Sequence, residues 1–178
     1  VHFMVMVLMR SRYKFVYLQN VPFTSKTTVY AHHLAFRYFG GVPKKVVYDQ
    51  DRRMLVNENY GDYVMTDEFA KYVKSVCFEP VFCMPYDPAS KGQSEAVVKY
   101  VKNNFLAGRT YVSIDSLNDE AIGWLERTGN GKVNSSTRLV PAEEFKTERL
   151  ELMPYVETME EPELEAREYS IRKDNTLL

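Results

Sequence analysis

Two carboxylates stand in settings that suit metal chemistry. Asp49 directly follows the short apolar run 45–48, and Glu95 lies eight residues into the segment 88–105, which has helical spacing of its apolar residues. Carboxylate oxygens are the ligands that Mg²⁺ prefers, and this ion takes one or two protein carboxylates together with phosphate oxygens and water. Two such ions about 3.5 to 4 Å apart serve in-line phosphoryl transfer. The pair therefore indicates metal-dependent phosphodiester chemistry, which needs no nucleophilic side chain.

Both carboxylates also have a purely structural interpretation. A single Asp at the end of a strand is more often a turn or cap residue than a catalytic one. Glu95 shares one helical stripe with Lys91, Lys99 and Lys102, and Glu–Lys pairs four residues apart stabilise solvent-exposed helices by a few tenths of a kcal/mol. In the functional interpretation, Glu95 binds metal while the three lysines bind DNA phosphates on either side. The residues alone leave both interpretations open.

The segments before Asp49 predict the element that positions it. Runs rich in Val, Phe, Tyr and Met over 1–9 and 14–19 predict two antiparallel strands joined by a short turn. A Thr-Ser pair can cap a following helix over 25–39, which ends at two glycines. The apolar run 46–48 predicts a short, buried strand of the parallel kind. Asp49 then lies at the carboxyl end of a strand, where open α/β sheets bind ligands.

The segments after Asp49 alternate between the two element types. We expect the following order: an irregular polar stretch over 51–65 with a turn at 57–62, a helix over 67–76, a strand over 79–83, a helix from Ser90 as its N-cap to Phe105, and a helix over 117–127. Glu95 would then lie near the positive end of its helix dipole. This order of strands and helices predicts an α/β layer fold with a mixed sheet.

Length and charge predict one main domain with an acidic extension. The chain has 178 residues, of which 45% are hydrophobic, enough for one substantial core. Residues 1–48 contain no Asp or Glu, whereas Glu dominates after 141. A basic first third suits contact with a polyanion, although a solvated lysine-rich surface is the commoner explanation. We assign 1–153 to a core domain and 154–178 to an acidic linker with the start of a truncated β-domain.

The cysteines, the histidines and the apolar opening run favour structural roles over a cysteine metal site or a membrane helix. Cys77 and Cys83 lack metal-ligand spacing, which predicts core thiols in a reducing, cytoplasmic compartment. His32 and His33 lie on an amphipathic helix, as structural or surface residues. The apolar opening run 1–9 is shorter than the roughly 18 residues of a membrane helix, so no membrane partner is expected.

Four motifs resemble the catalytic core of IstA-type bacterial insertion-sequence transposases. They are the segments 40–51, 87–106, 124–130 and 141–145. The resemblance implies a ribonuclease-H-like fold, with a mixed sheet, flanking helices and an Asp-Asp-Glu metal triad, as in the related retroviral integrases. Asp49 corresponds to the second member and Glu95 to the third. The first Asp belongs on a strand before Val1, so the resemblance implies that the chain lacks this first strand. Asn134 stands where relatives commonly carry His.

The same resemblance implies a reaction and its partners. DNA is nicked at the ends of an insertion element, and the freed 3′-hydroxyl then attacks target DNA. The implied cofactor is a pair of Mg²⁺ ions, for which Mn²⁺ can substitute. The implied partners are element-end and target DNA, further copies of the chain in a homo-oligomer on DNA, and an AAA+ ATPase helper, in the bacterial nucleoid.

Two alternatives come from other classes of protein. Because the first triad Asp is missing, the chain as it stands can be a non-catalytic DNA-binding or assembly fragment. Two carboxylates can also form the acid/base pair of a glycosidase, although the sequence shows no distinctive aromatic platform for a sugar.

Overall fold

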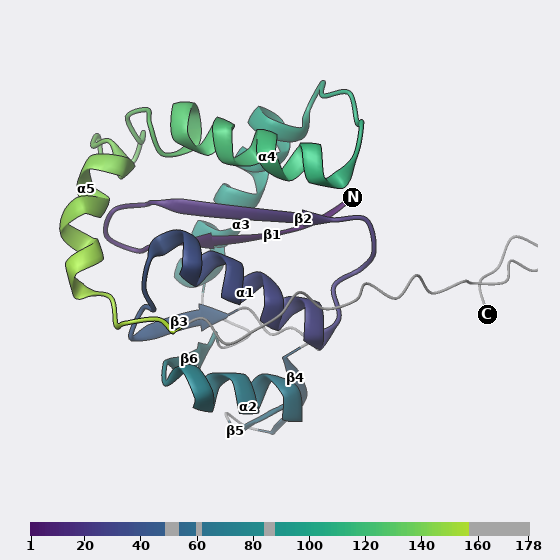
Figure 1. The fold of residues 1–178 in the computed structure, drawn as a ribbon. Coiled ribbons are helices and arrows are strands. Elements are labelled where there is room, and N and C mark those ends of the chain that lie inside the picture. Colours follow the sequence, from purple (N-terminus) through teal and green to yellow (C-terminus); the bar gives the residue numbers. More distant parts are fainter. Residues whose placement is uncertain (49–53, 60–61, 84–87, 157–178) are drawn as a thin grey trace, which may run out of the picture.

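The computed structural model describes residues 1–48, 54–59, 62–83 and 88–156. Within these ranges the strands form three two-stranded sheets with helices around them (Figure 1). The strands are β1 (His2–Val7), β2 (Lys14–Gln19), β3 (Lys45–Tyr48), β4 (Leu55–Asn59), β5 (Asp62–Met65) and β6 (Glu79–Phe82). The helices are α1 (Ser25–Phe39), α2 (Asp67–Val76), α3 (Pro88–Val101), α4 (Ile114–Trp124) and α5 (Pro141–Glu148).

The β1–β2 hairpin forms the central layer of the molecule. Its strands pair antiparallel from His2↔Gln19 to Val7↔Lys14. Side chains of successive residues of β2 enter different hydrophobic clusters: Phe15 packs in the cluster that includes α1, and Val16 in the cluster that includes α4. Figure 1 shows α1 on one side of the hairpin and α4 on the other. Both faces of β2 are therefore covered, which explains its almost continuously apolar sequence.

Helices α1 and α2 begin and end at the signals that the sequence carries. Thr24 caps α1 in a reciprocal pair with Thr27, and Gly40 ends it with a φ of 68°. The side chain of Thr66 accepts a hydrogen bond from the backbone N–H of Phe69 at the start of α2. Both predicted helices are confirmed, because caps and apolar spacing are local properties of the chain.

Strands β3 and β6 pair in parallel, with Tyr48 opposite Phe82. The predicted parallel strand is thus confirmed, and the α/β class with both kinds of strand pairing is confirmed with it. Two details differ from the expectation. The side chains of β3 alternate between buried and exposed, and Val47 is 52% exposed, so this strand is not buried on both faces. Within the described ranges the strands also form separate pairs, and no pairing joins β1 to β3.

Several elements were not predicted. The stretch expected to be irregular contains the β4–β5 hairpin, whose pairing is interrupted by a bulge between Leu55 and Asn57. Two π-helical turns extend α3 and α4, namely η1 (Lys102–Leu106) and η2 (Leu125–Gly129). Helix α5 and the short 3₁₀ turn η3 (Arg149–Glu151) follow, after which Met153 pairs with Val42 in an isolated antiparallel bridge.

Other expectations concern cysteines, membranes and the C-terminal segment. Cys77 and Cys83 form no disulfide among the described residues. Cys83 is buried as predicted, whereas Cys77, which ends α2 with a φ of 63°, is exposed. No helix in the described ranges has the length and apolarity to cross a membrane. The expected acidic linker and start of a β-domain were assigned to 154–178. Everything after Val156 in this segment lies outside the described residues.

Candidate active site

Tyr48 holds the end of the strand that leads to Asp49. Asp49 itself lies outside the described residues, but Tyr48 is 7% exposed and packs among three aromatic rings. Its ring centroid lies 5.5 Å from that of His32 on α1, 5.4 Å from that of Phe69 on α2 and 5.5 Å from that of Phe82 on β6. Three elements therefore fix the point from which the Asp49 segment leaves the strand.

The rings of His32 and Tyr48, at the end of β3, carry no charge near neutral pH. Nδ1 of His32 lies 2.7 Å from the carbonyl oxygen of Thr28, so this nitrogen carries the proton and donates to the carbonyl. Complete burial lowers the pKa of His32 to about 4, and burial raises the pKa of Tyr48 far above its usual value. His32 is thus a neutral support for β3, within the structural role predicted for it. The four-residue spacing of Thr28, His32 and Phe36 on one face of α1 is the local signal for this buried position.

The parallel pairing makes β3 end beside β6, the strand that precedes the Glu95 helix in the chain. Because Tyr48 lies opposite Phe82, both strands end together. Only residues 83–87 separate Phe82 from the start of α3, and a chain of this length spans at most about 20 Å. Glu95 is exposed on this helix.

The start of α3 differs from the prediction in one respect. The helix begins at Pro88, where a proline is well suited to the first turn, instead of being capped by Ser90. Glu95 consequently lies in the third turn, whereas the field of the helix dipole acts mainly within the first turn. The dipole therefore contributes little to the electrostatics of Glu95.

The predicted lysine stripe is described in part. Lys99 and Lys102 are exposed, as is Glu95, while the side chain of Lys91 lies outside the described residues. The opposite face of the helix is anchored by Val101 and Phe105, which are 0% and 1% exposed. The charged stripe and the buried face are thus separated as the helical spacing predicts.

The described residues hold one carboxylate of the predicted triad. Within them, no three His, Cys, Asp or Glu side chains come close enough to hold a metal ion. Glu95 can supply one carboxylate ligand, and its exposure leaves it accessible to an ion and to a phosphate. The remaining geometry of the site depends on the segment that contains Asp49.

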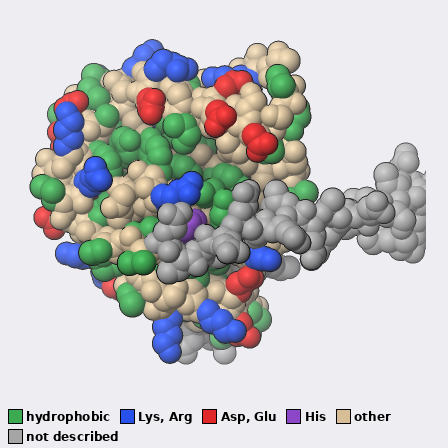
Figure 2. Space-filling view, in the orientation of Figure 1, with side chains coloured by type: hydrophobic (Ala, Val, Ile, Leu, Met, Phe, Trp, Pro, Cys, Tyr) green, Lys and Arg blue, Asp and Glu red, His purple; other side chains and the backbone are tan. Residues whose placement is uncertain are grey.

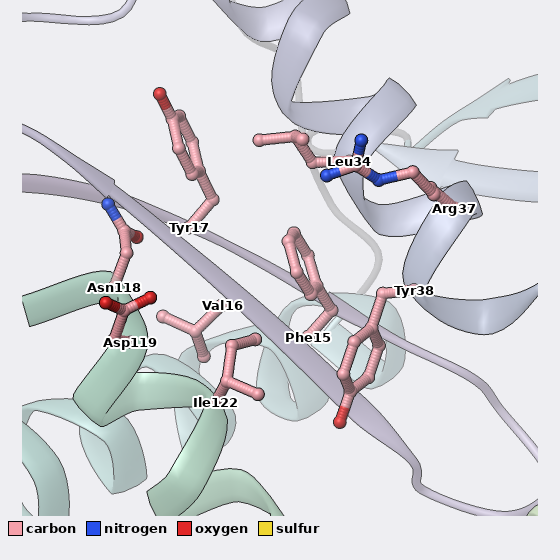
Figure 3. A pocket seen from close by; sticks show the side chains of 9 residues that line it. All are labelled: Phe15, Val16, Tyr17, Leu34, Arg37, Tyr38, Asn118, Asp119 and Ile122. Carbon is pink, nitrogen blue, oxygen red and sulfur yellow. The ribbon is translucent and has the colours of Figure 1, made fainter. Parts of the chain in front are cut away.

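A separate pocket of about 340 Å³ lies on another part of the molecule. It opens beside β2 and is lined by aromatic and aliphatic residues, with Arg37 of α1 and Asp119 of α4 across from each other (Figure 3). Figure 2 shows hydrophobic side chains gathered on this face, between the two helices. None of its lining residues comes from β3, β6 or α3, so the pocket is not part of the carboxylate site.

Comparisons with known proteins agree on one kind of relative. A transposase for an IS21-like insertion sequence element of Bacteroides fragilis is 52% identical over 99% of this chain and 34% of its own length. The putative transposase for IS5376 of Geobacillus stearothermophilus is 32% identical over 67% of this chain and 30% of its own length. The transposase for IS21 of Pseudomonas aeruginosa is 30% identical over 70% of this chain and 32% of its own length. The chain therefore spans about a third of the length of these relatives.

A solved structure shares the fold. One chain of the cryo-EM structure of the simian T-cell lymphotropic virus intasome in complex with PP2A regulatory subunit B56 gamma superposes with a TM-score of 0.62. The two chains are 15% identical, and the match covers 98% of this chain and 58% of that one. No family model matches the chain. With 52% identity across nearly its whole length to one such protein, the chain belongs to the family of transposases of IS21-like insertion sequences.

Proposed function

We propose that the chain is the larger part of the catalytic core of a DNA transposase, a polynucleotidyl transferase that uses an Asp-Asp-Glu metal site. The observation that supports this proposal is the parallel β3–β6 pair, in which the strand before Asp49 and the strand that precedes the helix of Glu95 end side by side. Exposed Lys99 and Lys102 on the same helix are suited to contacts with DNA phosphates.

The finer fold assignment is ribonuclease-H-like. It is supported by the order of strands and helices and by the shared fold with a chain of a retroviral intasome. In this fold one further strand lies between β1 and β3 and carries the first Asp. The unpaired edges of these two strands, within the described residues, are consistent with that arrangement.

Asp49 and Glu95 are the residues that would hold Mg²⁺, or Mn²⁺ in its place. Carboxylate oxygens fit these hard cations, and two ions in the intact site would activate the attacking oxygen and stabilise the leaving one. The first step forms a bond between a water oxygen and the phosphorus and breaks the bond to the 3′-oxygen. In the second step the freed 3′-hydroxyl oxygen attacks a phosphorus of target DNA, and the bond from that phosphorus to its own 3′-oxygen breaks, which leaves a 3′-hydroxyl on the target strand. Lys99 and Lys102 would orient the two DNA strands in both steps.

The proposed partners follow from this assignment. They are DNA at the element ends and at the target, further copies of the chain on that DNA, and an AAA+ ATPase helper, at the bacterial nucleoid. The relatives are named as transposases and the solved neighbour as part of an intasome, which supports DNA and assembly on it.

The test uses the complete transposase that carries this chain. Asp49→Asn and Glu95→Gln should each reduce nicking and strand transfer by at least about a thousandfold, because either change removes a metal ligand needed in both steps. Glu68→Gln, at an exposed carboxylate of α2, is the matched control and should leave both rates unchanged. Undiminished nicking in either site variant would contradict the assignment.

A second candidate is a DNA-binding or assembly fragment without catalysis. It is favoured by the exposed lysines Lys99 and Lys102 on the helix of Glu95. Under this alternative, Lys99→Glu and Lys102→Glu abolish DNA binding by the 178-residue chain, whereas Glu95→Gln changes neither its DNA binding nor its affinity for Mn²⁺. A fall in Mn²⁺ affinity in Glu95→Gln, measured by calorimetry, would favour the catalytic assignment.

A further inference from the structure

The loop between η2 and α5 is basic and free of acidic residues. No Asp or Glu occurs between Glu126 and Glu143. Lys132 and Arg138 are both exposed on this loop, as are the hydroxyl-bearing residues Ser135 and Ser136. In Figure 1 the loop lies at the upper left, between the end of α4 and α5 and far from α2. It therefore forms a small positive surface on an element that the proposed active site does not use.

The loop is held in one conformation by its own hydrogen bonds. The side-chain oxygen of Asn134 accepts from the backbone N–H groups of Ser136 at 3.0 Å and Thr137 at 3.2 Å. The backbone N–H of Asn134 donates to Leu139 at 2.8 Å, and its carbonyl accepts from Arg138 at 2.8 Å. A loop ordered before binding loses less conformational entropy when a ligand arrives.

The base of the loop is anchored in the core. Asn130 is 1% exposed, and its side chain accepts from the backbone N–H of Lys14 at 2.8 Å and donates to the carbonyl of the same residue at 2.9 Å. Arg138, by contrast, adopts a φ of 60°, a left-handed conformation that favours glycine.

We propose that the loop 132–138 binds the phosphate backbone of DNA, as a second contact separate from the lysines of α3. This inference rests on the proposed function, since it assumes that DNA is the substrate. Lysine, arginine and serine hydroxyl groups are the side chains that contact phosphates, and all three types are exposed within seven residues.

Salt dependence of DNA binding tests the proposal. The probe is a duplex of about 30 base pairs of arbitrary sequence, titrated with the 178-residue chain in EDTA and followed by fluorescence anisotropy at several KCl concentrations. The variant Lys132→Ala/Arg138→Gly removes both charges, and its glycine fits the φ of 60° without strain. The slope of log K against log salt should become shallower by about 1.8, that is about 0.9 for each lost phosphate contact.

Two further variants test whether the effect on DNA binding depends on where the charges lie and on the order of the loop. Lys71→Ala/Lys74→Ala removes the same net charge from exposed positions on α2 and should leave the slope unchanged. Asn134→Ala keeps every charge but frees the loop, so it should weaken binding two- to tenfold at an unchanged slope. An unchanged slope in the loop variant, or an equal fall in the α2 variant, would overturn the proposal. So would an equal loss of binding to poly-L-glutamate, which would identify the ligand as an acidic polypeptide.

Failure of this inference is distinguishable from failure of the proposed function. The binding assay contains no divalent metal and depends on no nicking. If Glu95→Gln left nicking intact while the slope of the loop variant became shallower as expected, the active-site assignment would fall and the DNA contact would stand. If instead Glu95→Gln abolished nicking and the loop variant kept the wild-type slope, only the proposed loop contact would fall.

Discussion

At the residue scale, Lys14 is a cation buried without a carboxylate partner among the described residues. It is 5% exposed, and its Nζ donates to the carbonyl oxygens of Arg12 at 2.8 Å and Gly129 at 2.9 Å. Burial, followed by the positive charge of Arg12, lowers the pKa of Lys14 from 10.5 to about 8. The side chain thus joins the hairpin turn to the end of η2, at an electrostatic cost in its charged form.

This lowered pKa predicts a pH-dependent stability. Between pH 8 and 10.5 the unfolded chain holds more protons at this position than the folded chain, so the free energy of unfolding rises with pH through that window, by at most about 1.4 kcal/mol per pH unit. The variant Lys14→Met should lack this contribution. Urea unfolding of both proteins at pH 8 and pH 10 measures the difference, and parallel changes in the two proteins would contradict the prediction.

At the element scale, two asparagines complete the outer edge of β2. The hydrogen bond from Leu8 N–H to the Tyr13 carbonyl sets the pairing of the hairpin, in which the backbone groups of Lys14 and Leu18 point away from β1. The side chain of Asn130 hydrogen-bonds with both backbone groups of Lys14. The side chain of Asn118 accepts from the backbone N–H of Leu18 at 2.9 Å and donates to the carbonyl oxygen of Leu18 at 3.0 Å. The side-chain amides stand where a neighbouring strand would pair, which protects the edge from other chains.

Removing these amides should destabilise the hairpin and expose its edge. Each of Asn118→Ala and Asn130→Ala leaves a backbone donor and acceptor unpaired, at a cost of about 1–3 kcal/mol in the free energy of unfolding. The double variant should also self-associate, as seen by sedimentation velocity. Asn103→Ala, at an exposed position in η1, is the matched control. A monomeric double variant of unchanged stability would show that the amides do not protect the edge.

The segment after α5 returns to α1 through a close contact at Gly41. A Cβ at this position would lie 2.7 Å from Cβ of Leu152 and 2.9 Å from the carbonyl oxygen of Met153. Gly41→Ala should therefore break the two 2.8 Å hydrogen bonds between Val42 and Met153. Hydrogen exchange of the Met153 amide should accelerate by an order of magnitude or more. Gly123→Ala, whose Cβ would meet only the side chain of Arg127, should leave that exchange rate unchanged.

At the scale of the whole molecule, the hairpin separates two hydrophobic clusters that share β2. One cluster contains Phe36 of α1, and the other contains Leu18 and Trp124, the single tryptophan of the chain. Because neighbouring residues of one strand belong to both clusters, we expect them to unfold together. Phe36→Ala should lower stability by about 3–5 kcal/mol.

Trp124 lets this cooperativity be measured. The fluorescence of Trp124 and the far-UV circular dichroism should change at the same urea concentration in the wild-type chain. Phe36→Ala should move both midpoints equally, although Trp124 lies in the other cluster. A fluorescence midpoint that stays in place would show that the two clusters are independent units.

The sequence predicted those elements whose signals are local. Helices α1 and α2 carry caps and apolar spacing within their own residues. The strand that ends at Tyr48 and the helix that carries Glu95 were also predicted. The β4–β5 hairpin was missed because its strands are short and do not alternate strictly between apolar and polar residues. The helices predicted to reach 105 and 127 are helical up to those residues, but apolar spacing does not show that their last turns, η1 and η2, are π-helical. Helix α5 was missed; it packs against a distant part of the chain, where the rings of Phe145 and Tyr13 stack 4.1 Å apart.

The sequence by itself determined where α1 and α2 begin and end, which residues can bind metal or phosphate, and the resemblance to insertion-sequence transposases. Tertiary structure alone decided which strands pair, that neutral His32 supports the strand before Asp49, that Val47 and Cys77 are exposed, and that a hydrogen-bonded loop presents Lys132 and Arg138. The physical reason is range. Caps and helical periodicity act over about four residues, whereas strand pairing and burial depend on contacts between residues such as Lys14 and Asn130, which lie 116 residues apart.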